Sequence, residues 1–317
     1  MPISFKEDHI SQIPALLMLE KLGYTYLTPD EALALRGGNL ANVLLEPVLR
    51  KQLAAINVVQ VSSVRTTVFS EQNITAGIDA LRNIPMDEGF MEASQTVYDL
   101  LTSGKTLEQI VDGDRKSFVM QYIDWKNPRN NVFHVTEEFA VSRTGMTETY
   151  RPDIVLFVNG IPLCVIECKR PDVKDSIEQA ISQHLRNQKA DGIRSLYLYS
   201  TLLLAINRQE GSYATTATPE KFWARWREQF TNREEEVRYR QELERVVNEP
   251  LLDDKLFGER FGYVRRNFEE LYRQPVIPSV QDEYLYNLCR PERLLQLMYG
   301  FTLYDDGIKK VARYQQH

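Results

Sequence analysis

The sequence predicts an α/β protein in which a mixed β-sheet is flanked by helices and followed by a mainly helical segment. Two apolar runs within residues 151–169 flank an Asn-Gly turn, which is a strong signal for a β-hairpin. Both faces of that hairpin are apolar, so helices should cover both sides of the sheet. A helix predicted over 175–189 and apolar strands over 196–199 and 202–207 then complete a mixed α/β core.

The remaining elements follow from periodicity and from helix and turn signals. The chain is predicted to be mostly helical up to about residue 101, and helical again in the densely charged part from residue 219 onward. We expect helices over 13–23 and 42–57, strands over 58–70, 118–123 and 132–141, and a turn over 127–131. Pro14 and Gly23 mark the start and end of the first helix.

The length of 317 residues exceeds that of a typical single domain. We therefore predict one large domain over 1–215 and a smaller, helical connector over 216–317. The longest apolar stretch is too short to cross a bilayer, so we expect no contact with a membrane. Residues 1–8 have no apolar signal core, and a cytoplasmic protein is therefore expected.

Charge and metal-ligand spacing exclude several classes of function. A net charge of −6 argues against a protein that binds DNA through bulk charge, although a local groove would still suffice. Cys164 and Cys168 share a strand face, and we expect them to be small core residues rather than ligands or a disulfide. The four histidines have no spacing typical of a metal site.

The hairpin carries charges where a buried sheet should not tolerate them. Asp153 stands at the entrance of the first strand, and Glu167 and Lys169 stand at the exit of the second. Burying two carboxylates with one lysine costs several kcal/mol unless the charges are paired. A divalent cation would pair them and would indicate phosphate chemistry. The alternative is a plain salt bridge between Lys169 and a carboxylate at the sheet edge.

The turn decides whether the two carboxylates share a face. A two-residue loop would pair Asp153 with Ile166 and would place Asp153 and Glu167 on opposite faces. A three-residue loop with Gly160 at its third position would pair Asp153 with Val165 instead. Asp153 would then be a diagonal neighbour of Glu167, roughly 7–8 Å away at the backbone. We predict the three-residue loop.

A further carboxylate lies on an apolar helix stripe. Glu46, Leu49 and Leu53 follow one another at steps of three and four in the helix predicted over 42–57. One interpretation is a helix-start glutamate whose head reaches water and is favoured by the helix dipole. The other is a third acidic group that faces the metal.

The stretch Glu167-Cys168-Lys169-Arg170-Pro171 resembles the Asp/Glu-x-Lys core of restriction endonucleases. The wider chain resembles the N-terminal part of the R (motor and cleavage) subunit of Type I restriction–modification enzymes over nearly its whole length. The other stretches that carry this resemblance are 43–50, 150–153, 183–188 and 310–316. The last is similar to the lead-in to the helicase motor, but no Gly-x-x-x-x-Gly-Lys-Ser/Thr loop occurs in the chain.

The resemblance implies a restriction-endonuclease-like fold and a Mg²⁺ site. Asp153 and Glu167 would bind Mg²⁺ together with the backbone carbonyl of Cys168, and Glu46 is a further candidate ligand. Lys169 would orient or help deprotonate the attacking water and would neutralise charge on the phosphate. In this interpretation Asp153, Glu167 and Lys169 are the catalytic residues.

The resemblance also implies supporting residues and partners. Gln183 and Arg170 would support DNA binding, whereas Asn187 stands where the family often has tyrosine. The implied partners are DNA and the methylation (M) and specificity (S) subunits of the restriction complex, and ATP would bind only to the full-length subunit. The implied activity is DNA cleavage without sequence specificity of its own. Two alternatives are a non-catalytic module that docks the motor onto the methyltransferase core and a standalone DNA-repair nuclease of the same fold.

Overall fold

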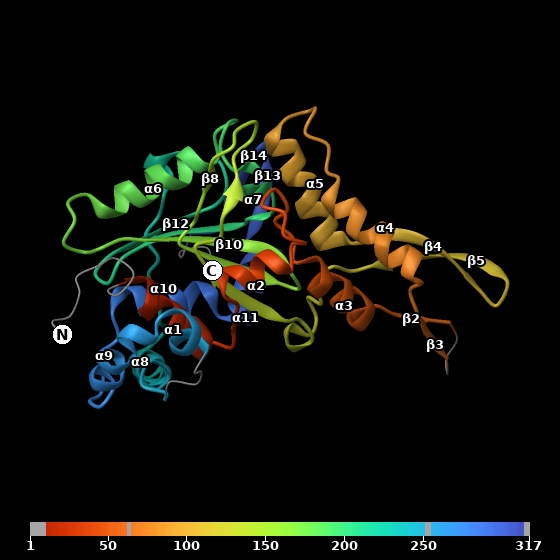
Figure 1. The fold of residues 1–317 in the computed structure, drawn as a ribbon. Coiled ribbons are helices and arrows are strands. Elements are labelled where there is room, and N and C mark those ends of the chain that lie inside the picture. Colours follow the sequence, from red (N-terminus) through yellow and green to blue (C-terminus); the bar gives the residue numbers. More distant parts are fainter. Residues whose placement is uncertain (1–10, 62–64, 251–254, 314–317) are drawn as a thin grey trace.

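The computed structural model describes residues 11–61, 65–250 and 255–313, and within them a six-stranded mixed sheet forms the centre. The sheet order is β1-β6-β9-β10-β11-β12 (Figure 1). These strands are β1 (Thr25–Tyr26), β6 (Phe133–Glu137), β9 (Ile154–Val158), β10 (Ile161–Cys168), β11 (Leu202–Ile206) and β12 (Gly211–Ala214). Pairs β1–β6 and β10–β11 are parallel and the other pairs are antiparallel. Every residue of β9 and β10 is buried, which confirms the predicted α/β core.

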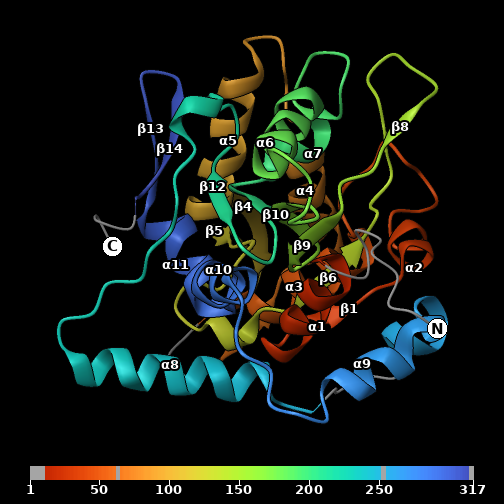
Figure 2. The ribbon, with the colours of Figure 1, turned by 90° about the vertical axis from the view of Figure 1, so that its left-hand side faces the viewer.

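Helices cover both faces of this sheet, as the two apolar faces of the hairpin predict. Helices α6 (Ser176–Asn187) and α7 (Arg194–Tyr199) pack against β10 and β11 on one face. Helices α1 (Ile13–Lys21) and α10 (Val280–Cys289) pack on the other face, below the sheet in Figure 1. The view in Figure 2 separates the two layers. The hairpin is therefore covered on both faces.

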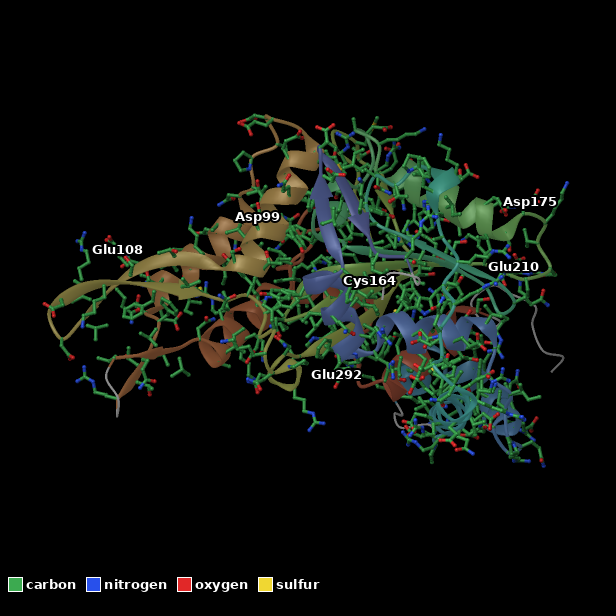
Figure 3. The ribbon with its side chains drawn as sticks, turned by 180° about the vertical axis from the view of Figure 1, so that it is seen from behind. Asp99, Glu108, Cys164, Asp175, Glu210 and Glu292 are labelled. Carbon is green, nitrogen blue, oxygen red and sulfur yellow. The ribbon has the colours of Figure 1, made fainter. Side chains whose placement is uncertain are left out.

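Helices and two-stranded ribbons extend the molecule on the side of the hairpin turn. They are α3 (Glu46–Ile56), α4 (Glu71–Arg82), α5 (Phe90–Ser103), β2 (Val58–Gln60) with β3 (Thr66–Val68), and β4 (Lys105–Val111) with β5 (Asp114–Met120). Helix α2 (Pro29–Ala34) follows β1 and packs against β6. A further ribbon joins β7 (Val141–Ser142) to β8 (Thr149–Tyr150). Figure 3 shows Cys164 near the centre, Glu108 on the projecting β4–β5 ribbon, and Asp175 towards the opposite end.

The C-terminal part consists of helices and one terminal hairpin. Its elements after the sheet are α8 (Arg233–Val247), α9 (Arg265–Leu271), α10, α11 (Pro291–Gly300), β13 (Thr302–Asp305) and β14 (Ile308–Val311). The predicted boundary at 215/216 follows the last sheet strand, but α10 shares one hydrophobic core with α1 and the sheet. The Tyr24 hydroxyl also donates to the Cys289 carbonyl at 2.7 Å. No helix in the described ranges is long and apolar enough to cross a membrane.

Some local predictions differ from the structure. The run over 196–199, predicted as a strand, belongs to helix α7, and all four of its side chains are buried. A short run without exposed positions has no periodicity that separates a helix from a strand. The strand predicted over 58–70 is two short strands, β2 and β3. Residues 1–8 and 314–316, used above for the signal and helicase arguments, lie outside the described residues.

Candidate active site

The turn between β9 and β10 contains two residues, so the predicted three-residue loop is wrong. Val158 pairs directly with Ile161, and both turn residues, Asn159 and Gly160, have positive φ angles of 52° and 84°. This is the pattern of a type I′ turn, which asparagine and glycine favour. The buried Asn159 side chain also accepts a hydrogen bond from the Val132 amide at 2.9 Å, which fixes the turn against β6.

A β-bulge in β10, shortly after the turn, returns Glu167 to the face of Asp153. Without it, the two-residue turn would place the two carboxylates on opposite faces. Pro162 pairs with Phe157 and Cys164 pairs with Leu156, so Leu163 is the extra residue of the bulged strand. Proline cannot donate a ladder hydrogen bond, and within sheets it is confined to edges, strand starts and bulges. Pro162 is therefore the sequence signal that could have predicted the bulge.

The shifted register brings the two carboxylates together. Beyond the bulge, Ile166 pairs with Ile154. Continuing this register by one residue places Asp153 opposite Glu167. Cross-strand partners lie on the same face of a sheet. The predicted shared face is therefore observed, as a direct rather than a diagonal pair and through a bulge rather than a longer loop.

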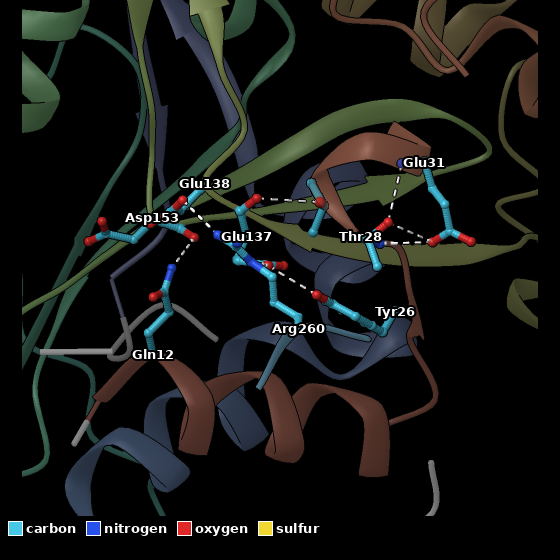
Figure 4. Close-up of polar contacts among 9 residues, drawn as sticks. Gln12, Tyr26, Thr28, Glu31, Glu137, Glu138, Asp153 and Arg260 are labelled. Carbon is cyan, nitrogen blue, oxygen red and sulfur yellow. Dashed lines mark hydrogen bonds and ion pairs between the residues drawn. The ribbon is translucent and has the colours of Figure 1, made fainter. Parts of the chain in front are cut away.

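Asp153 is held by hydrogen bonds to its backbone and to its side chain. Its Oδ2 accepts a hydrogen bond from the Cys168 amide at 2.7 Å and lies 3.4 Å from Lys169 Nζ. Its backbone carbonyl accepts a hydrogen bond from Gln12 Nε2 at 2.9 Å and another from the Glu138 amide at 3.0 Å (Figure 4). Strand β10, helix α1 and the end of β6 thus fix the position of this carboxylate.

Glu167 is a fully buried carboxylate that lacks donors. Its exposed fraction is 0%, and neither Oε1 nor Oε2 has a hydrogen-bond partner among the described residues. Burial, and secondly the charge of Asp153, raise the pKa of Glu167 well above its usual value, although Lys169 opposes this shift. A buried charge without partners is strongly unfavourable. A cation between the two carboxylates would remove that cost, so the residues fit a metal.

Glu137 in the same sheet shows how this protein stabilises a buried carboxylate elsewhere. Glu137 is also 0% exposed, but its Oε1 accepts hydrogen bonds from Arg260 Nε at 2.9 Å and from the Tyr26 hydroxyl at 3.0 Å (Figure 4). Glu167 has no equivalent arginine or tyrosine donor. The two residues therefore differ: one oxygen of Glu137 is hydrogen-bonded, whereas neither oxygen of Glu167 has a partner among the described residues.

Lys169 lies beside the two carboxylates. Its ion pair with Asp153 is the salt bridge that we considered as the alternative to a metal site. Its Nζ donates to the Cys168 carbonyl at 3.0 Å and pairs with Asp153, and its side chain is only 12% exposed. That salt bridge satisfies Asp153 but leaves Glu167 unpaired. A salt bridge alone consequently does not account for the buried glutamate.

Glu46 lies at the other end of the hairpin. The amide of the preceding residue, Leu45, donates to the Gly160 carbonyl at 2.9 Å, so the start of α3 packs on the turn. Strand β9, which has five residues and is roughly 17 Å long at about 3.3 Å per residue, lies between this turn and Asp153. Glu46 pairs with Arg82 and accepts a hydrogen bond from Asn42 Nδ2 at 3.0 Å. Among the described residues, the contacts of Glu46 are with Arg82 and Asn42 rather than with the carboxylates of the hairpin, and a metal-facing role for Glu46 stays a prediction.

The available donor set is consequently small. No group of three or more His, Cys, Asp or Glu side chains in the described ranges could hold a metal. Asp153, Glu167 and the Cys168 carbonyl are the oxygen donors that remain. Mg²⁺ is usually held by one or two carboxylates, substrate phosphates and water, so this set suits Mg²⁺ better than a structural metal.

Helix α6 covers the face on which Glu167 lies. Ala205, the β11 partner of Glu167, packs against Ile177 and Ile181 of α6. Gln183, the predicted DNA-support residue, is half-buried on the same helix. Arg170, the other predicted support residue, instead pairs with Asp172, its Nε donating to Oδ1 at 2.9 Å. The charge of Arg170 is therefore largely balanced within its own loop.

A buried His–Tyr pair behind Glu167 escaped the sequence analysis. His184 Nε2 lies 2.9 Å from the Leu204 carbonyl, and its Nδ1 lies 3.0 Å from the Tyr197 hydroxyl. Burial lowers the pKa of His184 to about 4, so the imidazole is neutral at pH 7. A neutral ring that donates through Nε2 accepts the Tyr197 proton at Nδ1. Tyr197 was missed because its segment was predicted to be a strand.

The sequence matches a known family over most of its length. Residues 4–222 match the family described as "Type I restriction enzyme R protein N terminus". The chain is 27% identical to the "Putative type I restriction enzyme MjaIXP endonuclease subunit" of Methanocaldococcus jannaschii over 228 residues, which cover 69% of this chain and 20% of the relative. It is 29% identical to the "Type I restriction enzyme HindI endonuclease subunit" of Haemophilus influenzae over 206 residues, covering 62% of this chain and 18% of that relative.

These matches agree with the fold and with the resemblance on which the sequence analysis relied. The aligned regions make up about a fifth of the length of these relatives. The family match includes the whole central sheet, helix α6 and the Asp153–Glu167 pair. The mixed sheet with helices on both faces is a restriction-endonuclease-like fold. The chain therefore belongs to the family of Type I restriction enzyme R protein N-terminal regions.

Proposed function

We propose that this chain is a Mg²⁺-dependent endonuclease domain that hydrolyses DNA phosphodiester bonds. The observation that carries the proposal is Glu167, a buried carboxylate without donors, opposite Asp153 and next to Lys169 on one sheet face. The relatives are named endonuclease subunits, which supports the same reaction class. The two carboxylates would bind a divalent cation, and the cation together with Lys169 would bind an anionic substrate such as a phosphodiester.

The residues would divide the work as follows. Asp153, Glu167 and the Cys168 carbonyl would hold Mg²⁺, with Asp153 fixed by the Cys168 amide. When bound, Mg²⁺ would polarise the scissile phosphate and stabilise charge on the departing oxygen. Lys169 would orient the attacking water, help remove its proton and neutralise negative charge on the phosphate.

We propose that cleavage takes place within a larger restriction complex. The chain spans about a fifth of the length of its relatives, and its net charge of −6 gives it little bulk attraction for DNA. DNA recognition would then come from a specificity (S) subunit that acts with a methylation (M) subunit. This chain would cut without sequence preference, and ATP binding would belong to the motor part of the full-length subunit.

The second candidate is a non-catalytic module that docks the motor onto the methyltransferase core. A docking surface would be exposed, whereas Glu167 is fully buried and Lys169 is only 12% exposed in its side chain. An unpaired buried glutamate destabilises a domain that only has to dock. The catalytic proposal is therefore favoured.

The test is DNA nicking by the reconstituted complex with and without Mg²⁺. We expect Lys169→Ala to lower the cleavage rate by about 10²–10⁴-fold, as loss of a group that acts on the transition state does. Lys174→Ala is the matched control, because Lys174 is 91% exposed in its side chain and lies only five residues away. Equal cleavage by wild type and Lys169→Ala, with the complex intact on gel filtration, would favour the docking module instead.

A further inference from the structure

Arg186, on the last turn of α6, has an arrangement that the proposed cleavage chemistry does not use. Its Nε and Nη2 atoms both donate to Asn187 Oδ1, at 3.3 and 3.1 Å. Its guanidinium also lies over the ring of Tyr150, 4.5 Å from the centroid. An exposed arginine normally samples many rotamers, so these contacts lower the entropy cost of holding the group in one place.

Both residues that hold Arg186 are themselves fixed. Asn187 is 0% exposed, and its backbone carbonyl accepts a hydrogen bond from the Ile193 amide at 2.8 Å. Tyr150 ends strand β8, which stands next to α6 in Figure 1, and precedes Asp153 by three residues. Arg186 is thus held between the helix that covers the site and the segment that leads into Asp153.

Arg143, on the same tyrosine, shows what a purely structural arginine looks like here. Its guanidinium carbon lies 4.7 Å from the Tyr150 ring centroid. Arg143 is neutralised, because its guanidinium pairs with Asp191 at 2.6 Å and lies 3.9 Å from Glu148. Arg186 has no carboxylate partner among the described residues, although its charge reaches Glu167. One of the two arginines on Tyr150 therefore keeps a free positive charge.

We propose that Arg186 binds a phosphate of the DNA backbone beside the scissile phosphate, and that Asn187 and Tyr150 hold its guanidinium for this contact. This inference rests on the proposed endonuclease function. The guanidinium fork matches phosphate oxygens, and the atoms not bound to Asn187 remain for the ligand. Gln183, three residues earlier on α6, lies on the same side of the helix and would face the same backbone. Asn187 thereby has a role of its own at the position where the family often has tyrosine.

The experiment measures binding of a short duplex to the wild-type chain and to Arg186→Gln, without Mg²⁺ so that no strand is cut. Fluorescence anisotropy is followed across a salt series, up to protein concentrations of about 10⁻⁴ M, the weak end of non-specific DNA binding. We expect Arg186→Gln to bind roughly tenfold more weakly and to lose about one unit of salt slope, as removal of one phosphate contact does. Arg186→Lys should restore the slope but not the full affinity, because an ammonium lacks the fork and the flat face.

Two further variants distinguish a specific phosphate contact by Arg186 from general attraction by positive charge. Lys189→Gln removes the same charge from an exposed position just beyond α6 and should change affinity less than Arg186→Gln. Asn187→Ala keeps the charge but releases the guanidinium, so affinity should fall while the salt slope stays. Equal effects of Arg186→Gln and Lys189→Gln would overturn the proposal. It would also be overturned if the folded wild-type chain bound no duplex at low salt.

Asp153→Asn distinguishes failure of this inference from failure of the endonuclease proposal. In the reconstituted complex, Asp153→Asn should abolish cleavage, whereas Arg186→Gln should raise KM for DNA more than it lowers kcat. If Asp153→Asn is inactive while Arg186→Gln retains wild-type affinity and KM, only the phosphate contact is wrong. If Asp153→Asn still cuts DNA, the cleavage proposal itself fails.

Discussion

The burial of Glu167 lowers the stability of the folded chain as long as no cation is bound beside it. The residue is fully buried without hydrogen-bond donors among the described residues, and its pKa is raised well above 4.5. The folded chain therefore holds a proton at pH values where the unfolded carboxyl is ionised. The stability contributed by this group is present at low pH and is lost as pH rises through the window above 4.5.

The first prediction follows from that sign. In EDTA at pH 8, Glu167→Gln should be more stable than wild type by roughly 1–3 kcal/mol, because a buried charge without partners is removed. Wild type should gain stability when Mg²⁺ is added and the variant should gain much less. Thermal unfolding with and without Mg²⁺ measures both effects. The exposed residue Glu88 supplies the control, and Glu88→Gln should behave as wild type. A destabilised Glu167→Gln in EDTA would contradict the prediction.

At the residue scale, the types and spacing of Asp153, Glu167 and Lys169 were sufficient to single them out. The shared face of Asp153 and Glu167 was expected from a three-residue loop and comes instead from the bulge at Leu163, so strand alternation alone would not have given it. Glu46 was ambiguous, because its helix stripe only shows that it faces protein. Whether that protein is the site or the turn depends on tertiary packing. Arg186 was visible as a residue three after Gln183, but its partner Tyr150 belongs to a distant strand.

Among the elements, the β9–β10 hairpin depends most on its turn. Gly160 has a φ of +84°, and a Cβ added there would lie 2.6 Å from the Leu45 carbonyl oxygen and 3.1 Å from the Leu49 amide nitrogen. Both contacts are with the backbone of α3, which cannot move aside like a flexible side chain. The glycine therefore serves the positive φ and the close packing of α3 at the same time.

The second prediction compares two glycines with the same backbone strain. Gly160→Ala should destabilise the chain by several kcal/mol, because it combines positive φ with overpacking. Gly307 also has a positive φ of +71°, but no atom lies within 4 Å of its added Cβ. Gly307→Ala should therefore cost only about 1 kcal/mol. Urea unfolding measures the difference, and equal losses in the two variants would show that packing of α3 on the turn is unimportant.

Elements were predicted well where periodicity was long and poorly where it was short. Helix α6 was predicted over 175–189 and is observed over Ser176–Asn187, because twelve residues display a full amphipathic stripe. The run predicted as a strand covers only four of the six residues of α7, and all four are buried, so they show no contrast between two faces. The length of the turn was predicted wrongly for another reason. Both loop lengths are compatible with an Asn-Gly sequence, and the packing of α3 and the bulge decide between them.

At the scale of the whole molecule, the C-terminal hairpin packs against the N-terminal part. Lys309 of β14 is 3% exposed, and its Nζ donates to the Ser200 carbonyl at 3.1 Å and to Thr201 Oγ1 at 3.4 Å. Burial lowers the pKa of Lys309 to about 7. The Tyr98 hydroxyl of α5 donates to the Thr302 carbonyl at 2.7 Å, which connects the same hairpin to a residue 204 positions away.

The third prediction is a pH dependence of stability. Between pH 7 and 10.5 the unfolded Lys309 is protonated while the folded one is largely neutral, so stability should rise with pH in this window. Between pH 7 and 9 the free energy of unfolding should rise by about 2 kcal/mol. The slope approaches about 1.4 kcal/mol per pH unit only once the folded Lys309 is fully neutral, because at pH 7 it is still half protonated. Lys309→Met should be more stable at pH 7 and should lose this part of the slope. The control Lys310→Met removes the exposed ion pair with Asp305 and should leave this part of the pH slope unchanged. Urea unfolding at both pH values decides the matter.

The single extra residue in β10 makes the site sensitive to residue count as well as to residue identity. A hairpin with a two-residue turn and no bulge pairs residues whose numbers differ by an odd amount, whereas Asp153 and Glu167 differ by fourteen. An even separation around such a turn therefore implies one inserted residue somewhere in the strands. Deleting Leu163 would reduce the separation to thirteen, and a hairpin without a bulge would then still pair Asp153 with Glu167 on one face. A relative that keeps the separation of fourteen but forms no bulge would instead place the two carboxylates on opposite sides of the sheet, and so could keep the motif and lose the site.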